Sequence, residues 1–114
     1  MRNVRVAIAI LAIGSMALVG TPVALADPIA DGQGLVQEYC SDCHAIGKAG
    51  ESPLAIAPRF RDLHLRYDVE DLSEALVEGI VTAHEEMPAF EFDPIQAAAT
   101  IAYLKSLSEP GHGQ

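Results

Sequence analysis

The chain has 114 residues, of which sixteen are acidic and seven are basic, so its formal net charge is −9 at pH 7. This acidic balance argues against nucleic acid or an anionic membrane surface as a partner, because like charges repel. No strand-like alternation and no internal repeat is evident, and half of the residues are hydrophobic.

The first 26 residues have the features of an export signal. Two arginines give a positive start, an apolar run covers residues 6–19, and residues 24–26 (Ala-Leu-Ala) form a small-x-small cleavage pattern. The run is shorter than the roughly 20 apolar residues that a membrane-spanning helix needs. We expect residues 1–26 to be removed before Asp27, which would leave a soluble periplasmic protein without stable membrane insertion. An uncleaved anchor is the alternative.

The remaining residues 27–114 are expected to form one domain. They hold all sixteen acidic residues and five basic ones, which gives a net charge of −11. A domain this small buries only about 60% of its unfolded surface and often needs a metal, a disulfide or a cofactor. The charge favours a basic docking patch on a partner protein, although solubility would explain it equally well.

Residues 32–39 predict a short helix at the start of this domain. Asp31 is placed to cap it, because its side-chain oxygen can accept hydrogen bonds from the free amides of the first turn. Leu35 and Tyr39 are four positions apart and share one face. Gly32 has no side chain, so another helix could cross closely there.

Both cysteines of the chain occur in Cys40-Ser41-Asp42-Cys43-His44. Two thiols three positions apart, followed directly by an imidazole, suit one haem. The thiols would add to its vinyl groups as thioethers, and His44 would supply an axial nitrogen to the iron. The motif therefore predicts one covalent haem c, and it directs attention to a second axial ligand.

Other uses of a cysteine pair fit this sequence less well. A thiol–disulfide oxidoreductase places the pair at a helix start in a βαβ setting, and no such strand pattern is present. A zinc site needs two further ligands at suitable spacing, and His64 and His84 do not form a recognisable set. The imidazole directly after Cys43 favours haem.

Residues 45–58 lose helical periodicity and contain two glycines and two prolines. A loop of this length in a small domain is expected to wrap around something, here the haem edge. The carbonyl of Pro58 could accept a hydrogen bond from the second ring nitrogen of His44, which would fix the imidazole tautomer. The alternative is that Pro58 is only a turn residue before Phe60.

Two short helical segments are predicted next. Phe60 and Leu63, with Leu65 beside them, indicate an apolar helical turn. Asp68 then caps a helix over residues 69–81, with acidic residues in its first turn. One face of that helix is apolar and consists of Leu72, Ala75, Leu76, Gly79 and Ile80.

Met87 is the only methionine outside the export signal. Its thioether is a soft ligand that suits haem iron, and Pro88 stiffens the backbone beside it. Met87 is therefore the candidate for the second axial position, with core filling as the alternative. His84 is its rival but is expected to be a solvated loop residue. His64 is expected at the surface or the haem edge, and His112 in the tail.

The last helix has a strong start signal. Asp93 is placed to cap it, Pro94 suits its first position, and Gln96 can reach back to the cap. Apolar residues recur at three- and four-residue steps, with Tyr103 adjacent: Ala97, Ile101, Leu104 and Leu107. The helix is expected to end before Pro110, so that residues 109–114 form a loose tail.

These features together resemble the small class I c-type cytochromes of bacteria. The resemblance rests on residues 40–44, on Met87-Pro88 and on residues 101–104 (Ile-Ala-Tyr-Leu), and it covers residues 31–108. It implies an all-α fold in which three to five short helices wrap around one covalent haem, with the first and last helices crossing.

The resemblance also implies roles for particular residues. His44 and Met87 would be the axial ligands, Pro58 would be the carbonyl partner of His44, and Gly32 and Tyr103 would lie near the helix crossing. There are two departures from the family. The chain has no tryptophan, and Val36 stands where many relatives have an aromatic residue.

The function implied is that of an exported monomeric carrier of single electrons, with redox proteins as donor and acceptor. Two filled axial positions leave no site for a substrate, so the chain is not expected to be an enzyme. The alternatives are a dedicated haem subunit of a periplasmic dehydrogenase or oxidase, a haem domain that binds a small gas after Met87 leaves, and a metal or redox module without haem.

Overall fold

The structure is a computed structural model that describes residues 10–12, 14–15, 17–22, 26–79 and 87–109. Within these ranges the chain forms helices, turns and irregular segments, and no strand. This confirms the predicted all-α class. None of the helices in the described ranges is long and apolar enough to cross a membrane.

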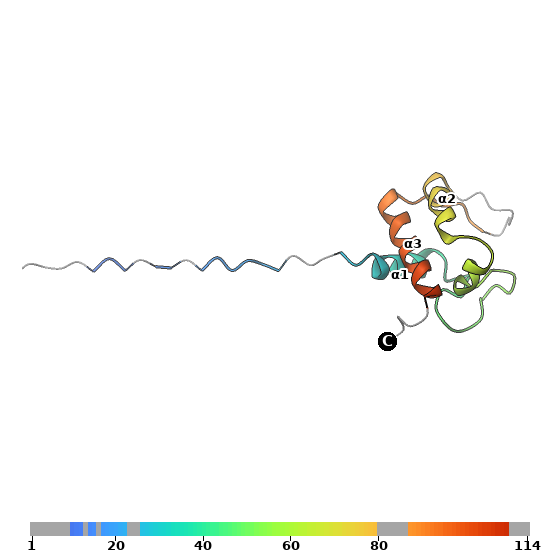
Figure 1. The fold of residues 1–114 in the computed structure, drawn as a ribbon, viewed down its shortest axis with the longest axis horizontal. Coiled ribbons are helices and arrows are strands. Elements are labelled where there is room, and N and C mark those ends of the chain that lie inside the picture. The colour runs from blue at the N-terminus through green and yellow to red at the C-terminus, as the bar shows by residue number, and fades with distance from the viewer. Residues whose placement is uncertain (1–9, 13, 16, 23–25, 80–86, 110–114) are drawn as a thin grey trace, which may run out of the picture.

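Five helical elements follow one another in the described part of the chain, three of them α-helices and two 3₁₀ helices. They are α1 (Pro28–Tyr39), η1 (Phe60–Leu65), η2 (Val69–Asp71), α2 (Leu72–Glu78) and α3 (Pro94–Ser108). Figure 1 shows α1 and α3 crossing in the helical body, with α2 beside them. The described residues before α1 run away from this body as an extended segment.

The first helix starts four residues before its predicted position, so the predicted cap was wrong. Asp27 is the N-cap, and its carboxylate accepts hydrogen bonds from the amides of Ile29 at 3.1 Å and Ala30 at 3.2 Å. Asp31 lies inside the first turn. The helix can begin directly after Asp27 because the fixed φ of Pro28 suits the first helical position.

The crossing of α1 and α3 depends on Gly32. A Cβ at this position would overlap the backbone carbonyl oxygen of Ala99 and would lie 2.8 Å from the Cβ of Tyr103. One turn further along α1, the side chain of Val36 is fully buried. The missing side chain therefore lets the two backbones approach closely at the place that was predicted for the crossing.

The middle of the chain is less regular than expected. The predicted turn at residues 60–65 is present as η1, in which Phe60 and Leu63 are buried, but Leu65 is 74% exposed and does not belong to the core. Leu65 points away because a 3₁₀ helix repeats every three residues, which places Phe60 and Leu63 on one side.

The helix predicted over residues 69–81 is interrupted. Asp68 caps it as expected, since its carboxylate accepts a hydrogen bond from the Glu70 amide at 3.0 Å. The first turn is the 3₁₀ helix η2, and the α-helical part, α2, ends at Gly79, whose φ of +96° is incompatible with continuing the helix. Residues 80–81 lie outside the described ranges.

The start of α3 is as predicted. The Asp93 carboxylate accepts a hydrogen bond from the Gln96 amide at 2.8 Å, and the Gln96 side-chain oxygen accepts one from the Asp93 amide at 3.0 Å. Pro94 occupies the first helical position. This capping box satisfies two amides that would otherwise be unpaired.

The core contains side chains from every helical element, and α3 contributes most to it. Its buried apolar residues include Val36, Phe60, Leu63, Val69, Leu76, Phe92, Ala97, Ile101, Tyr103 and Leu104. At the surface, Lys105 of α3 forms an ion pair with Glu70 of η2 at 2.8 Å. By contrast, Ile10, Leu11, Leu18 and Val19 of the leading segment are at least 85% exposed and contribute nothing to the core.

Candidate functional site

The two cysteines lie in a tight turn that follows α1 directly. The carbonyl oxygen of Cys40 accepts hydrogen bonds from the amides of Cys43, at 3.2 Å, and His44, at 3.0 Å. Neither cysteine forms a disulfide. Because the turn reverses the chain at Cys40, both thiols and the imidazole border one cavity.

The two thiols differ in their surroundings. Cys40 is buried, whereas Cys43 is half-buried. Burial, followed by the nearby Cys43, raises the pKa of the Cys40 thiol from 9.0 to about 11. The surroundings of Cys40 therefore disfavour its thiolate form.

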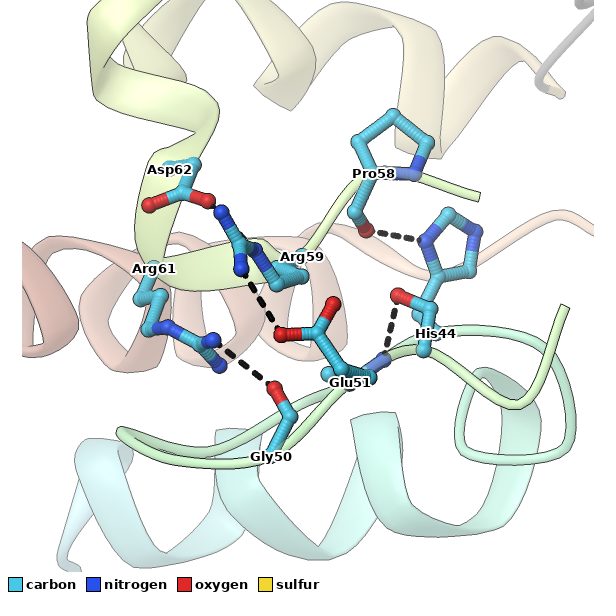
Figure 2. Close-up of polar contacts among 9 residues, drawn as sticks. His44, Gly50, Glu51, Pro58, Arg59, Arg61 and Asp62 are labelled. Atoms are coloured by element: carbon cyan, nitrogen blue, oxygen red, sulfur yellow. Dashed lines mark hydrogen bonds and ion pairs between the residues drawn. The ribbon is translucent and has the colours of Figure 1, made fainter. Parts of the chain in front are cut away.

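The imidazole of His44 is fixed by one hydrogen bond. Its Nδ1 lies 2.7 Å from the carbonyl oxygen of Pro58, and Figure 2 shows the ring turned toward this oxygen. A carbonyl can only accept, so Nδ1 carries the proton and Nε2 keeps its lone pair. The ring also lies against Phe60, with 4.8 Å between the ring centroids. The arrangement leaves Nε2 as a nitrogen that can bind a metal.

Three hydrogen bonds hold the loop of residues 45–58, and one of them joins it to the turn of residues 40–44, the attachment turn. The Leu54 amide donates to the Cys43 carbonyl at 3.1 Å, and the Phe60 amide donates to the Ala45 carbonyl at 2.9 Å. The hydroxyl of Ser52 accepts a hydrogen bond from the Ala45 amide at 3.0 Å. These contacts close the loop around His44.

Two arginines hold the outer side of the same loop (Figure 2). Arg59 pairs with Asp62 at 2.7 Å and with Glu51 at 3.0 Å, and Arg61 donates to the carbonyl of Gly50 at 2.7 Å. The hydrogen bond to Asp62, followed by the charges of Asp62 and Glu51, raises the pKa of Arg59. Such exposed pairs contribute little energy each, but together they restrict the loop next to Pro58.

Two cavities, of about 170 Å³ and about 260 Å³, meet at the centre of the fold. The first lies between the attachment turn, residues 54–58 and residues 87–90. The second extends inward between α1, η1, α2 and α3. Both cavities are bordered by Cys40, His44, Pro58, Met87 and Phe90.

The structure brings the predicted site residues together. Met87, which is far from His44 in sequence, borders the same two cavities as His44 and Cys40. His64 is exposed on η1 and borders neither cavity. His84 and His112 lie outside the described ranges.

The residues around the cavities fit a covalent haem. Two free thiols, an imidazole with an available Nε2 and a thioether sulfur are the donors that a haem c uses. The rest of the wall is largely apolar and includes Val36, Leu63, Leu72, Leu76 and Leu104. In the described ranges no group of three or more His, Cys, Asp or Glu side chains is arranged to hold a metal ion.

Several residues that support the site were not identified from the sequence. The pairing of Arg59 with Asp62 has a local signal, because the two are three positions apart on a helical turn. The contact of Arg59 with Glu51 spans eight residues of irregular loop, and the contact of Tyr103 with Ile46 joins segments that are distant in sequence. No local pattern could have indicated them.

Comparison with known proteins identifies the family. Residues 27–104 match the family model described as "Cytochrome C oxidase, cbb3-type, subunit III". The chain is also 30% identical over 84 residues to Cytochrome c-552 of Bradyrhizobium diazoefficiens, a match that covers 74% of this chain and 79% of that protein. No solved structure matches the chain significantly. The chain therefore belongs to this family of c-type cytochromes, and as a small electron carrier it holds a covalently bound haem c.

Proposed function

We propose that the chain is an exported carrier of single electrons in which His44 and Met87 are the axial ligands of the haem iron. The observation that carries this proposal is that both residues border both cavities, next to Cys40. Haem, when bound, supplies an iron that alternates between the ferrous and the ferric state. The protein's own residues hold the group, exclude water from it and set its potential.

Each residue of the site has one task in this proposal. Cys40 and Cys43 form the two thioether bonds, and Pro58 keeps the proton on Nδ1 of His44, so that Nε2 faces the metal. Met87, which borders both cavities, would supply a second ligand to the iron, and no position would then remain for a substrate. A methionine opposite a histidine favours the reduced state and raises the potential.

The second cavity suggests where the haem carboxylates would lie. Arg66 is the only cationic residue among the described residues that border either cavity, and Tyr67 is next to it. A guanidinium and a phenol are suitable hydrogen-bond donors for carboxylates. Arg66 and Tyr67 would therefore hold the carboxylates of the haem, and the thiols would bind its vinyl groups.

Export is supported by the first segment of the chain. Of its described apolar residues, Ile10, Leu11, Leu18 and Val19 are at least 85% exposed. Its sequence has the positive start, apolar run and small-residue pattern of a cleaved signal. Cleavage before Asp27 would leave residues 27–114 as a periplasmic cytochrome domain that functions as a monomer. Mass spectrometry of the exported protein checks both the cleavage position and the presence of one covalent haem.

The axial ligation is tested by the absorption spectrum of Met87→Ala. We expect the wild-type ferric protein to show a sulfur-to-iron charge-transfer band and Met87→Ala to lack it. His64→Ala is the matched control, because His64 is exposed and borders neither cavity, and it should retain the band. A five-coordinate, high-spin ferrous spectrum in the wild type would rule out the proposed ligation.

A second candidate function is that of a dedicated haem subunit of a terminal oxidase. It is favoured by the family description, which names a subunit of a cytochrome c oxidase. Purification from the native host under mild conditions distinguishes the two. A freely diffusing carrier is expected as a monomer in the soluble fraction, whereas a dedicated subunit remains with its enzyme.

A further inference from the structure

Three aromatic rings connect the haem-attachment segment with the segment that carries Met87. Tyr39 is the last residue of α1 and directly precedes Cys40. Phe90 and Phe92 lie shortly after Met87 in the chain. The ring centroid of Tyr39 is 5.3 Å from that of Phe92, with an interplanar angle of 71°, and 6.4 Å from that of Phe90. Because the Phe90 and Phe92 centroids are 5.0 Å apart, the three rings form a closed triangle.

The triangle is anchored to the core on one side and reaches the surface on the other. Phe92 is only 4% exposed, and its amide donates a hydrogen bond to the Leu76 carbonyl of α2 at 2.8 Å. Tyr39 is 46% exposed. Phe92 is thus packed in the core, and Tyr39 lies on the solvent-exposed side of the three rings.

The three rings border the same cavities as Met87. Tyr39, Phe90 and Met87 border the first cavity, and Phe92 borders the second together with Phe90 and Met87. Residues 87–92 form neither helix nor strand, so no ladder of backbone hydrogen bonds fixes them. The hydrogen bond of the Phe92 amide to Leu76 ties the end of this segment to α2, and the contacts of Phe90 and Phe92 with Tyr39 tie it to the end of α1, next to Cys40.

We propose that Tyr39, Phe90 and Phe92 form an aromatic clasp that holds the Met87 segment against the attachment segment and so keeps the Met87 sulfur on the iron. The three are positioning residues, because they act through Met87. Ring pairs at these separations interact more favourably than their buried area alone explains. Loss of one ring should therefore increase the fraction of molecules in which the Met87 sulfur is not bound to the iron. This proposal rests on the assignment of Met87 as an axial ligand.

The test is a titration of the purified ferric holoprotein with imidazole, followed by absorption. Imidazole can bind only when the sulfur is away, so its apparent Kd is the intrinsic Kd divided by the open fraction. We expect Tyr39→Leu and Phe90→Leu to lower the apparent Kd roughly three- to tenfold. Tyr39→Phe is the matched control, because it keeps the ring and loses only the hydroxyl, and its Kd should be unchanged.

A double variant tests whether the two rings act through each other. If they form one clasp, the effect of Tyr39→Leu combined with Phe90→Leu is smaller than the product of the two single effects. An imidazole affinity that stays at the wild-type value in Tyr39→Leu overturns the proposal. Tyr39 is half-exposed, so this variant decides the question even where Phe90→Leu fails to fold. Haem content and circular dichroism verify folding.

Met87→Ala separates this proposal from the one on which it rests. It lacks the sulfur, so its imidazole Kd should be the intrinsic value, well below that of the wild type. If Met87→Ala binds imidazole no more tightly than the wild type, the axial assignment of Met87 is wrong. If Met87→Ala binds imidazole more tightly than the wild type and the ring variants do not, the axial assignment stands and only the proposal of the aromatic clasp is wrong.

Discussion

The tautomer of the His44 imidazole is determined by Pro58, a residue that has no backbone amide hydrogen to donate. Pro58 contributes only a carbonyl oxygen, and the 2.7 Å contact with Nδ1 requires the proton to be on that nitrogen. The sequence indicated this pairing as one of two possible roles for Pro58. It could not indicate how the carbonyl is held there, because Glu51, Arg59 and Asp62 form their ion pairs only in the folded chain.

Tyr103 is a second residue whose side chain connects distant segments. Its buried hydroxyl donates to the Ile46 carbonyl at 2.7 Å, which joins α3 to the loop after His44. Burial raises the pKa of this phenol, which favours its protonated, hydrogen-bond-donating form. We expect Tyr103→Phe to lower the free energy of unfolding by about 1 kcal/mol, because the half-buried Ile46 carbonyl loses its partner.

Denaturant unfolding of the holoprotein measures this loss, and Tyr39→Phe is the control. The ring of Tyr39 is 46% exposed, so removal of its hydroxyl should change stability little. Equal stability of Tyr103→Phe and the wild type would show that the hydrogen bond makes no net contribution.

At the scale of the element, the start of α1 shows how two similar signals compete. Asp27 and Asp31 are both suitable caps, and the helical pattern of residues 32–39 predicts Asp31. The structure begins the helix at Pro28. Proline at the first helical position is the stronger signal, since it has no amide to leave unpaired.

The position of the cap can be tested by a pair of alanine substitutions. We expect Asp27→Ala to lower the free energy of unfolding by about 1 kcal/mol, because two amides lose their acceptor. Asp31→Ala should cost less, since Asp31 caps nothing and alanine is the better helix former. Thermal unfolding of both variants provides the comparison, and a larger loss in Asp31→Ala would contradict the observed helix start.

The crossing of α1 and α3 can be tested within one helix, because α1 contains two glycines in different surroundings. A Cβ on Gly32 would overlap the Ala99 carbonyl, whereas a Cβ on Gly34 would meet no atom within 4 Å. We expect Gly32→Ala to destabilise the protein by about 1–3 kcal/mol through overpacking. Gly34→Ala should stabilise it by roughly 0.5–1 kcal/mol, because alanine loses less backbone entropy in a helix.

Denaturant midpoints of the two glycine variants provide the measurement. Effects of the same sign in Gly32→Ala and Gly34→Ala would mean that close approach does not govern the crossing. The sequence alone suggested a crossing at Gly32, because a missing side chain permits contact. The sequence did not show that Gly34, two positions further along the same helix, lies away from the crossing.

In residues 69–79 the sequence pattern predicts the buried face of the helix but not its hydrogen bonding. The apolar spacing of Leu72 and Leu76 predicted a helix, and α2 contains both. The spacing did not reveal that the first turn is a 3₁₀ helix, since periodicity reports which face is buried and not which amide pairs with which carbonyl. The end at Gly79 depends on a positive φ, which a glycine permits but does not require.

For the molecule as a whole, the sequence predicted the fold class and the cofactor because each has a local signature. The attachment motif lies within residues 40–44, and the capping box of α3 lies within residues 93–96. The path of residues 45–58, the two cavities and the aromatic clasp were not predictable, because they depend on contacts between segments far apart in the chain.

The charge of the whole molecule leads to a prediction about association. The domain of residues 27–114 carries a net charge of −11, and we propose that a redox partner binds it through a basic patch. The rate of electron transfer to such a partner should fall as ionic strength rises, because screening weakens the attraction that speeds the encounter. Stopped-flow kinetics over a salt series measure this, with a neutral small-molecule reductant as the control. A rate that is independent of salt would exclude electrostatic docking.

The cap of α1 connects the folding of the domain with its export. Asp27 accepts the hydrogen bonds that start the helix, and it is also the residue at which we propose that the mature chain begins. A signal peptidase that cuts before Asp27 leaves the cap in place, whereas a cut one residue later removes it. Selection on the cleavage site would then act on two properties at once, because the residue that defines the new N-terminus also stabilises the first helix.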